Sequence, residues 1–275
     1  MASPCEVHVA DPSRKTAQNV VDAVITETRR IEKKYSRYRS DSITCSINTA
    51  DGRWTAIDAE TASLLDYADK LFNLSNGKFD ITSGVLRQVW KFDGSDRVPS
   101  QSAIENVRKL IGWQRVQLQT NRIRLEAGME IDFGGIGKEY AVDRAGLIAQ
   151  RITPQCMINF GGDLVATGTA VSAHSWHVAV ENPAAETSPK THIELIRGAI
   201  ATSGDSQRFL LKNGTRYSHI LNPLTGWPVV NAARSITVSA ATCTLAGMLA
   251  TFAMLHGADA EAFLDRENVE YWCIR

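Results

Sequence analysis

Residues Gly134–Asp143 read GGIGKEYAVD and follow the apolar and acidic run MEIDF. Gly134, Gly135 and Gly137 lack a Cβ, so the backbone there can adopt unusual φ angles and let another group approach closely. The helix-like sequence that follows would offer free N–H groups and the positive end of its dipole, and Lys138 adds a charge in the first turn. The stretch therefore predicts a turn into a helix that can bind a phosphate or pyrophosphate. The alternative is a tight turn that needs glycine only for packing, because neither the dinucleotide fingerprint nor the P-loop pattern is present.

The sequence on both sides of this loop predicts a mixture of helices and strands. Apolar residues at helical spacing predict helices at Thr16–Lys34, from a cap at Asp58 to a stop at Asn76-Gly77, at Ser100–Ile111, Tyr140–Ile152, Thr244–His256 and Asp259–Asn268. In the second of these helices, we expect Leu64, Leu65, Ala68, Leu71, Phe72 and Leu74 to form the buried face. Strand-like runs are Cys5–Val9, Val116–Gln119, Ile123–Ala127, Glu130–Phe133, Cys156–Phe160, Ser175–Pro183, Ile193–Thr202, Gln207–Ile220, Ala233–Ala240 and Val269–Arg275. Helices and strands do not alternate strictly, which favours an α+β fold.

The composition narrows the classes of partner. Thirty basic and thirty acidic side chains cancel, so no general attraction to nucleic acid or to an anionic membrane is indicated. No apolar run reaches about 18 residues, so no membrane span is expected. The five cysteines are scattered, without C-x-x-C or zinc spacing, and their odd number argues against a complete disulfide framework. No leader is visible, so we expect a cytoplasmic protein, with a periplasmic location as the alternative if a leader was removed.

Polar residues elsewhere form three further candidate segments. In Ser75–Phe92, Asp80 and Thr82 follow a helix stop, and Trp90 and Phe92 either stack on a planar ligand or belong to the core. The segment ATSGD, which ends at Asp205, is either a site or a polar turn. In YSHILNPLTGWPV, His219 is either a structural histidine or a general acid or base placed before a rigid turn.

Seven collinear segments together resemble the ApbE family of FAD:protein FMN transferases. In chain order they read MASPCEV, SRYRSDSITCSIN, GKFDITSGVLRQVW, EIDFGGIGKEYAVD, INFGGDLVATG, ATSGD and YSHILNPLTGWP. The resemblance runs nearly from end to end, and it implies a single T-fold-like domain over residues 1–275, with mixed and antiparallel sheets and packed helices.

The resemblance also implies a reaction. Members of this family bind FAD and a divalent metal, usually Mg²⁺, cleave the pyrophosphate, and attach FMN to a threonine or serine of an acceptor flavoprotein, releasing AMP. Some members hydrolyse FAD to FMN and AMP. Such phosphoryl-type transfer rests on metal, positioning and charge stabilisation.

The family's functional positions can be carried over onto this sequence. The flavin-nucleotide contacts that the resemblance implies are Met1, Tyr38, Lys78, Phe79, Asp80, Asp132, Lys138 and Ile220. His219 corresponds to the histidine implicated in transfer, as the base for the acceptor hydroxyl. The metal ligands implied are the carbonyl of Gly135 and the side chain of Thr251.

At one position the sequence departs from the family pattern. The family has an aspartate four residues before the threonine on the late helix, and this chain has Gly247 there; Glu139 also replaces a frequent glycine after the lysine. Mg²⁺ prefers anionic oxygen ligands, so Gly247→Asp is expected to tighten Mg²⁺ binding, unless another acid such as Asp163 or Asp205 supplies the charge. The competing hypotheses are therefore an active transferase, an FAD-binding protein with weak or no transfer, and an FAD pyrophosphatase.

Overall fold

The computed structural model describes residues 3–169, 175–180, 191–205 and 208–275. The chain forms two compact units, each assembled from segments that are distant in the sequence. Unit 1 comprises Met1–Glu32, Ile136–Gly204 and Ala232–Arg275, and unit 2 comprises Lys33–Gly135 and Asp205–Asn231. The division falls inside the glycine loop, after Gly135. The single domain expected for residues 1–275 stays a prediction.

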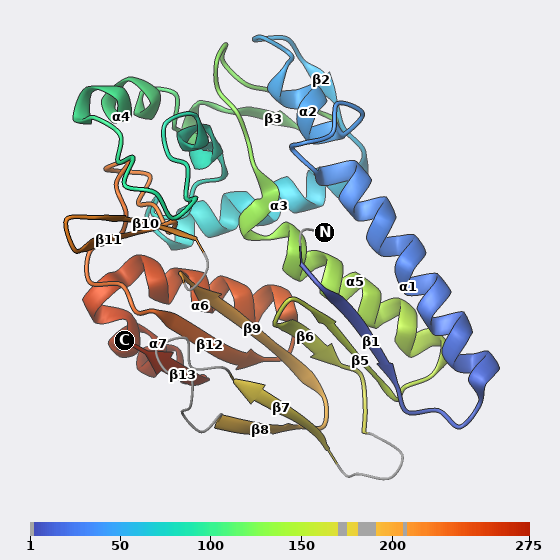
Figure 1. Ribbon diagram of the computed structural model, residues 1–275. Coiled ribbons are helices and arrows are strands. Elements are labelled where there is room, and N and C mark those ends of the chain that lie inside the picture. Colours follow the sequence, from blue (N-terminus) through green and yellow to red (C-terminus); the bar gives the residue numbers. More distant parts are fainter. Residues whose placement is uncertain (1–2, 170–174, 181–190, 206–207) are drawn as a thin grey trace. The chain divides into compact units, whose positions relative to one another are not determined.

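Unit 1 is organised around a six-stranded sheet in which all neighbouring strands are antiparallel (Figure 1). In spatial order the strands are β1 (Cys5–Val9), β5 (Cys156–Phe160), β6 (Asp163–Ala166), β9 (Gly198–Gly204), β12 (Ser235–Ala240) and β13 (Glu270–Ile274). Gly161 and Gly162 turn β5 into β6 with φ angles of 63° and 95°, which glycine adopts without strain. This tight turn places Asp163 at the start of β6.

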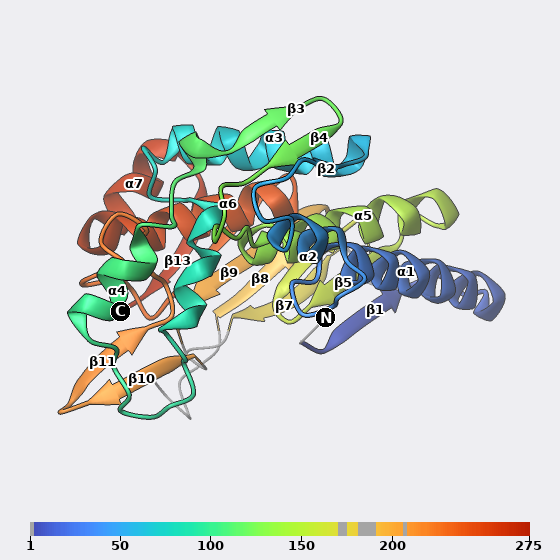
Figure 2. The same ribbon diagram turned by 90° about the horizontal axis from the view of Figure 1, so that it is seen from above.

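Helices cover one face of this sheet. Helix α5 (Gly137–Ile152) contacts β5 and β6, and α6 (Cys243–His256) contacts β9 and β12 (Figures 1 and 2). Gly146 lets α5 approach closely, because a Cβ there would lie 2.7 Å from Cγ1 of Val165. Two further helices, α1 (Arg14–Tyr35) and α7 (Ala260–Glu267), complete this layer: Arg144 of α5 donates to Glu27 of α1 over 3.0 Å, and α7 contacts α6.

The opposite face of the sheet is covered by a hairpin of β7 (Trp176–Val180) and β8 (Thr191–Leu195). Because side chains alternate along a strand, Leu164 and Ile200 point to this face while Val165 points to α5. The buried cluster between hairpin and sheet consists of Met157, Leu164, Ala166, Ile193, Leu195 and Ile200.

Unit 2 combines short helices with small antiparallel sheets. Its helices are α2 (Ile43–Asn48), α3 (Ala59–Leu74) and α4 (Gln101–Arg108), with 3-10 turns at Ile81–Gln88, Trp113–Arg115 and Phe133–Gly135. Strands β2 (Thr55–Ala56), β4 (Arg122–Arg124) and β3 (Gln117–Gln119) form one sheet in that order, and β10 (Phe209–Lys212) and β11 (Thr215–Ser218) form a hairpin. Leu86, Trp90, Ile104 and Leu210 make a core that joins the hairpin to the helical part.

The α+β class and the antiparallel sheets are confirmed, as are two predicted helix starts. Asp58 caps α3 by accepting the Thr61 N–H over 2.9 Å, and Ser100 caps α4 by accepting the Ala103 N–H over 3.3 Å. Helix α5 begins at Gly137, one turn earlier than expected. No helix in the described part of the chain is both long and apolar enough to cross a membrane.

Several predicted elements differ from the structure. Glu130–Phe133 is not a strand: the Asn48 side chain binds both backbone polar groups of Ile131, so no strand partner is needed. Leu74 is 68% exposed rather than buried. The run Ile193–Thr202 is broken by Gly198 at φ 123°, and Gln207–Ile220 folds back at Asn213-Gly214, where both φ angles are positive. Residues 181–183 of the expected strand Ser175–Pro183 and Met1 lie outside the described residues.

Candidate active site

The glycine loop uses its missing side chains for close approach. A Cβ at Gly135 would lie 3.1 Å from Cε2 of Phe79, and one at Gly134 would lie 3.1 Å from Oδ2 of Asp132. None of the loop's three glycines has a positive φ, so the expectation of unusual φ angles is wrong there. Helix α5 starts directly after the loop, and no side chain caps its N-terminus in the described structure.

Asp132 organises the loop from within unit 2. Its Oδ1 accepts the Gly134 N–H over 3.0 Å, and its other oxygen forms an ion pair with Arg37. Asp132 can pack against the backbone of residue 84 because that residue is a glycine: a Cβ at Gly84 would lie only 2.6 Å from the Asp132 Cβ. Sequence reasoning missed Arg37, although it stands beside Tyr38 in the segment SRYRSDSITCSIN. Arg37 lies 4.9 Å over the Tyr38 ring and donates to its hydroxyl, and Tyr38 is 82% exposed.

Asp80 is buried and fully engaged with neighbouring donors. Its Oδ1 accepts the Thr82 N–H and hydroxyl over 2.7 and 2.6 Å, and its Oδ2 accepts the Trp113 N–H over 3.0 Å. Thr82 in turn accepts the Gly112 N–H over 2.8 Å. Phe79 is buried and Lys78 is half-buried. Asp80 thus fixes the geometry of this segment, and its oxygens are occupied by protein donors.

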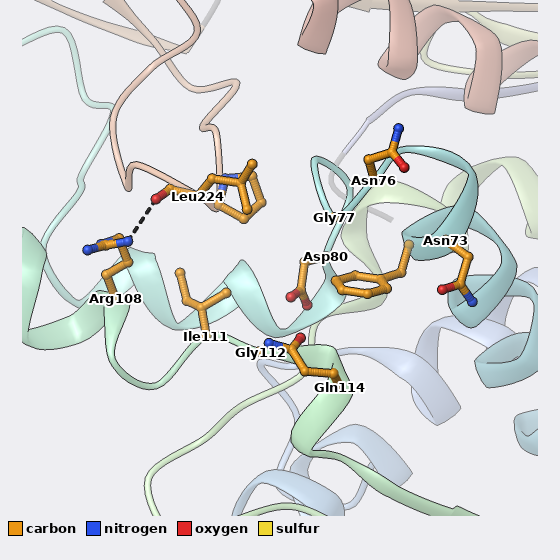
Figure 3. Close-up of a pocket in the computed structure, with 11 residues that line it drawn as sticks. Asn73, Asn76, Gly77, Asp80, Arg108, Ile111, Gly112, Gln114 and Leu224 are labelled. Carbon is orange, nitrogen blue, oxygen red and sulfur yellow. Dashed lines mark hydrogen bonds between the residues drawn. The ribbon is translucent and has the colours of Figure 1, made fainter.

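A cavity of about 570 Å³ lies beside this segment within unit 2 (Figure 3). Figure 3 shows Asp80 at its centre, with Gly77 and Asn76 on one side and Arg108 and Leu224 on the other. Its remaining lining residues are Phe72, Asn73, Ile111, Gly112, Gln114 and Pro223. Arg108 donates to the Leu224 carbonyl over 2.8 Å, which ties α4 to the Pro-Leu turn. The volume is in the range typical of small-ligand pockets.

The aromatic residues of the same segment belong to the core. Trp90 is 3% exposed, stacks on Phe92 with ring centroids 5.5 Å apart, and donates from its indole N–H to the Gly226 carbonyl over 2.9 Å. For Trp90 the structural alternative is therefore the correct one. Phe92 also meets His219 edge-on, with ring centroids 6.3 Å apart.

His219 follows β11, and its side chain is half-buried. Its Nδ1 is buried and has no hydrogen-bond partner among the described residues, while its backbone N–H donates to the Arg208 carbonyl over 3.2 Å. Burial lowers the pKa of His219, and the charge of Arg208 lowers it further. The ring is therefore neutral near pH 7, which is the form that can accept a proton. Ile220, the next residue, is half-buried and held through its backbone by Ser218 and Val229.

In unit 1, Lys138 and Glu139 begin α5 and meet Asp163 of β6. Lys138 Nζ lies 2.6 Å from Asp163 Oδ2, and Asp163 Oδ1 accepts the Thr202 N–H over 3.0 Å. Glu139 Oε2 is buried and has no hydrogen-bond partner among the described residues. Burial raises the pKa of Glu139, and the negative charge of Asp163 raises it further. Burial also raises the pKa of Asp163, against the effect of Lys138.

Glu139 occupies the space next to Gly247 of α6. A Cβ built on Gly247 would lie 2.5 Å from the Glu139 Cγ and 3.1 Å from both Cδ and Oε1. Thr251 is four residues further along α6, so it lies on the same face as Gly247, roughly 6 Å along the axis. Sequence reasoning noted Gly247 and Glu139 separately and missed that they are in contact. The signal was that the family has a side chain at position 247 and often a glycine at position 139, whereas this chain has the reverse.

Other acids considered from the sequence have different surroundings. Asp205 belongs to unit 2, where its Oδ2 accepts from Arg216 Nε over 3.0 Å. In the part of the chain that the structure describes, no group of three or more histidine, cysteine or acidic side chains is arranged to hold a metal. Of the implied metal ligands, Gly135 lies in unit 2 and Thr251 in unit 1.

Comparison with known proteins gives consistent matches over almost the whole chain. A model described as the ApbE family matches residues 1–273. The FAD:protein FMN transferase of Vibrio cholerae is 30% identical over 253 residues, which cover 88% of this chain and 74% of that protein. The crystal structure of the ApbE protein from Thermotoga maritima has a TM-score of 0.86 at 33% identity, covering 97% of this chain and 88% of that one.

A second solved structure, the flavin transferase ApbE from Vibrio cholerae, has a TM-score of 0.85 at 27% identity, covering 99% of this chain and 90% of that one. The expected α+β fold is thereby confirmed. The motif order, the fold and the matched length lead to one conclusion: the chain belongs to the ApbE family.

Proposed function

We propose that this protein is a magnesium-dependent FAD:protein FMN transferase. A serine or threonine hydroxyl of an acceptor flavoprotein forms a bond to the FMN phosphorus of FAD. The bond from that phosphorus to the bridging pyrophosphate oxygen breaks, and AMP leaves. Family membership and the similarity to curated FAD:protein FMN transferases support this proposal.

The observation that carries the proposal is the state of His219. The reaction needs a neutral base for the acceptor hydroxyl, and burial together with Arg208 lowers the pKa of His219, which keeps it neutral. Its buried Nδ1 has no hydrogen-bond partner among the described residues. A histidine already bonded to a protein donor or acceptor would first have to break that bond.

For FAD itself, the proposed contacts fall in both units. In unit 2 they are Tyr38, the Lys78–Asp80 segment, Asp132 and Ile220, and the cavity beside Asp80 has room for one ring system. In unit 1, Lys138 stands in the first turn of α5, where its charge and the helix N-terminus favour a phosphate. Met1 is proposed from the family pattern alone.

The residues present also fit a divalent cation. Mg²⁺ takes oxygen ligands and is commonly bound through one or two carboxylates plus substrate phosphates. In unit 1 the Thr251 hydroxyl is an oxygen donor of this kind, and Glu139 of α5, which lies next to Gly247 of α6, has a buried carboxylate oxygen without a hydrogen-bond partner among the described residues. The Gly135 carbonyl of unit 2 is proposed from the family pattern alone. When bound, the metal would neutralise charge that develops on the phosphates.

The test is to incubate the protein with FAD, Mg²⁺ and an acceptor that carries an Asp-Gly-x-Ser/Thr-Gly-Ala-Thr-like segment, and to follow flavin fluorescence on the acceptor in a denaturing gel. We expect labelling, and we expect His219→Ala to lose about 10²-fold or more in rate while keeping FAD affinity. An Asn213→Ala variant, altered in the exposed hairpin turn, serves as the control.

The alternatives give different results in the same assay. Retained FAD binding without labelling would indicate a flavin-binding protein, and release of AMP without labelling would indicate a pyrophosphatase. Full labelling by His219→Ala would remove this histidine from the mechanism.

A further inference from the structure

Helix α5 presents two acidic side chains to α6, one turn apart. Asp143 is completely used: it accepts the Cys243 N–H over 2.7 Å, the Thr244 N–H over 2.9 Å, and the Thr244 hydroxyl. These bonds hold the start of α6 against α5 and fix the register of the two helices. One turn earlier on α5, Glu139 therefore meets α6 one turn later, at Gly247.

Glu139 differs from Asp143 because it has no such donors. Its Oε2 is buried without a hydrogen-bond partner among the described residues. A buried acceptor without a partner is uncommon in folded proteins and calls for an explanation. The α6 backbone opposite it is already bonded within the helix, so α6 offers no N–H to Glu139.

The charges around Glu139 favour the binding of a cation. Glu139 and Asp163 are two acids, and Lys138, 2.6 Å from Asp163, is the cation paired with them. In the described surroundings Lys138 is the positive charge that acts on both acids, and it lowers the pKa of each against the effect of burial. Buried charges in proteins are paired or bind metals.

Gly247 makes this arrangement sterically possible. Because any side chain at position 247 would collide with the Glu139 Cγ, the glycine and the glutamate occupy one shared volume. The carboxylate that reaches this volume comes from α5, and the hydroxyl of Thr251 stands one turn away on α6.

We propose that Glu139 is a ligand of a divalent cation, supplying from α5 the carboxylate that α6 lacks at Gly247. The inference rests on the proposed function for the role of that cation in FMN transfer, and on the geometry of α5, α6 and β6 for its place. Asp163 and Lys138 hold Glu139 in position, and Thr251 is the second protein donor.

The test measures metal binding directly, with Mn²⁺ as the probe. Electron paramagnetic resonance reports the concentration of free Mn²⁺, and the titration is done with and without FAD. We expect Glu139→Gln, which keeps the shape of the side chain, to weaken Mn²⁺ binding at least tenfold. The exchange Glu139→Gly with Gly247→Asp moves the carboxylate to α6, and we expect it to restore affinity to within about threefold of wild type. Glu270→Gln, which removes an exposed acid from β13, should bind as wild type.

Two outcomes would overturn the inference: Mn²⁺ binding by Glu139→Gln equal to that of wild type, or no Mn²⁺ binding by wild type even with FAD. The proposed function fails separately, if wild type binds Mn²⁺ through Glu139 but labels no acceptor. Conversely, Mg²⁺-dependent labelling by a Glu139→Gln variant with unchanged Mn²⁺ affinity would retain the function and reject Glu139 as a ligand.

Discussion

Asp80 of unit 2 and Glu139 of unit 1 are both acids with buried oxygens, but their surroundings are opposite. Asp80 is 6% exposed and accepts three hydrogen bonds from Thr82 and Trp113. Glu139 has a buried oxygen with no partner among the described residues, and its nearest neighbour on α6 is a glycine. Both positions were singled out in the sequence, but the sequence does not show how the oxygens of either acid are bonded.

The difference separates two roles for an acid in a site. An acid whose oxygens are all bonded to backbone N–H groups fixes the loops around it, and removing it exposes those donors. An acid without donors is a cost to the folded protein unless a ligand completes it. We therefore assign Asp80 to the shape of its cavity and Glu139 to the binding of a cation.

The largest effect is expected from Asp80→Ala. This change leaves the Thr82 and Trp113 N–H groups buried without an acceptor, at about 1–3 kcal/mol each, so the free energy of unfolding should fall by about 3 kcal/mol. Urea unfolding measures it. Thr82→Val, which removes the hydroxyl bond to Asp80 and leaves the Gly112 N–H without its acceptor, should cost about 2 kcal/mol. A loss of less than about 1 kcal/mol for Asp80→Ala would show that the three bonds are not what holds this segment.

A smaller effect is expected from Gly247→Ala. Its Cβ would collide with the Glu139 Cγ, and such overpacking costs about 1–3 kcal/mol. In a Glu139→Gly background the collision is gone and alanine is the better helix former, so the cost should vanish. Gly247→Asp made alone should therefore be destabilised as well, which replaces the simpler expectation that it only tightens Mg²⁺ binding.

The matched control for this pair is Gly146→Ala, where the Cβ would meet Val165 instead. Its cost should be the same with glutamate or glycine at position 139, because Val165 does not change. A double-mutant cycle from thermal or urea unfolding gives both coupling energies. Equal coupling for the two glycines would mean that Glu139 and Gly247 are not a specific pair.

For Glu139→Gln we expect a change in stability opposite in sign to that of Asp80→Ala. Without metal, the glutamine removes a buried acid that the charge of Asp163 disfavours, so the free energy of unfolding should rise by about 1 kcal/mol. With Mg²⁺ present, wild type should gain stability and the variant should not. Asp143→Asn, on the same face of α5, should lower stability and keep the Mg²⁺ response. A destabilised Glu139→Gln protein without metal would contradict the unpartnered state of this side chain.

The sequence predicted much of the fold because local signals were strong. Asp58 and Ser100 stand directly before apolar periodic runs, and both cap helices. The predictions failed where a distant residue decides: Asn48 binds the backbone of Ile131, 83 positions away, and abolishes the expected strand Glu130–Phe133. Leu74 fits the helical period but is exposed, since periodicity does not tell where the covering elements end.

For the candidate site, the motif positions could be read from the sequence and their chemical states could not. Lys138 and Asp163 are 25 positions apart in the sequence. They form an ion pair only because α5 packs on β6. Arg37 was missed because its partner Asp132 is 95 positions away in the sequence. The contact of Glu139 with Gly247 depends on the register of α5 and α6, which Asp143 fixes through backbone bonds that no side-chain pattern reveals.

The smallest expected effect tests His219, whose buried Nδ1, like the Oε2 of Glu139, has no hydrogen-bond partner among the described residues. Burial, reinforced by Arg208, lowers its pKa in the folded protein below the ordinary value of about 6.5. As the pH falls through that ordinary value, the unfolded chain therefore binds a proton before the folded protein does, and the stability present above it decreases until the folded pKa is reached. Urea unfolding of wild type and His219→Gln between about pH 7.5 and pH 5 should thus show a steeper loss for wild type, and Arg208→Gln should reduce that loss. Parallel pH profiles for wild type and His219→Gln would mean that the folded protein takes up the proton as readily as the unfolded chain, and His219 would then not be held neutral by its surroundings.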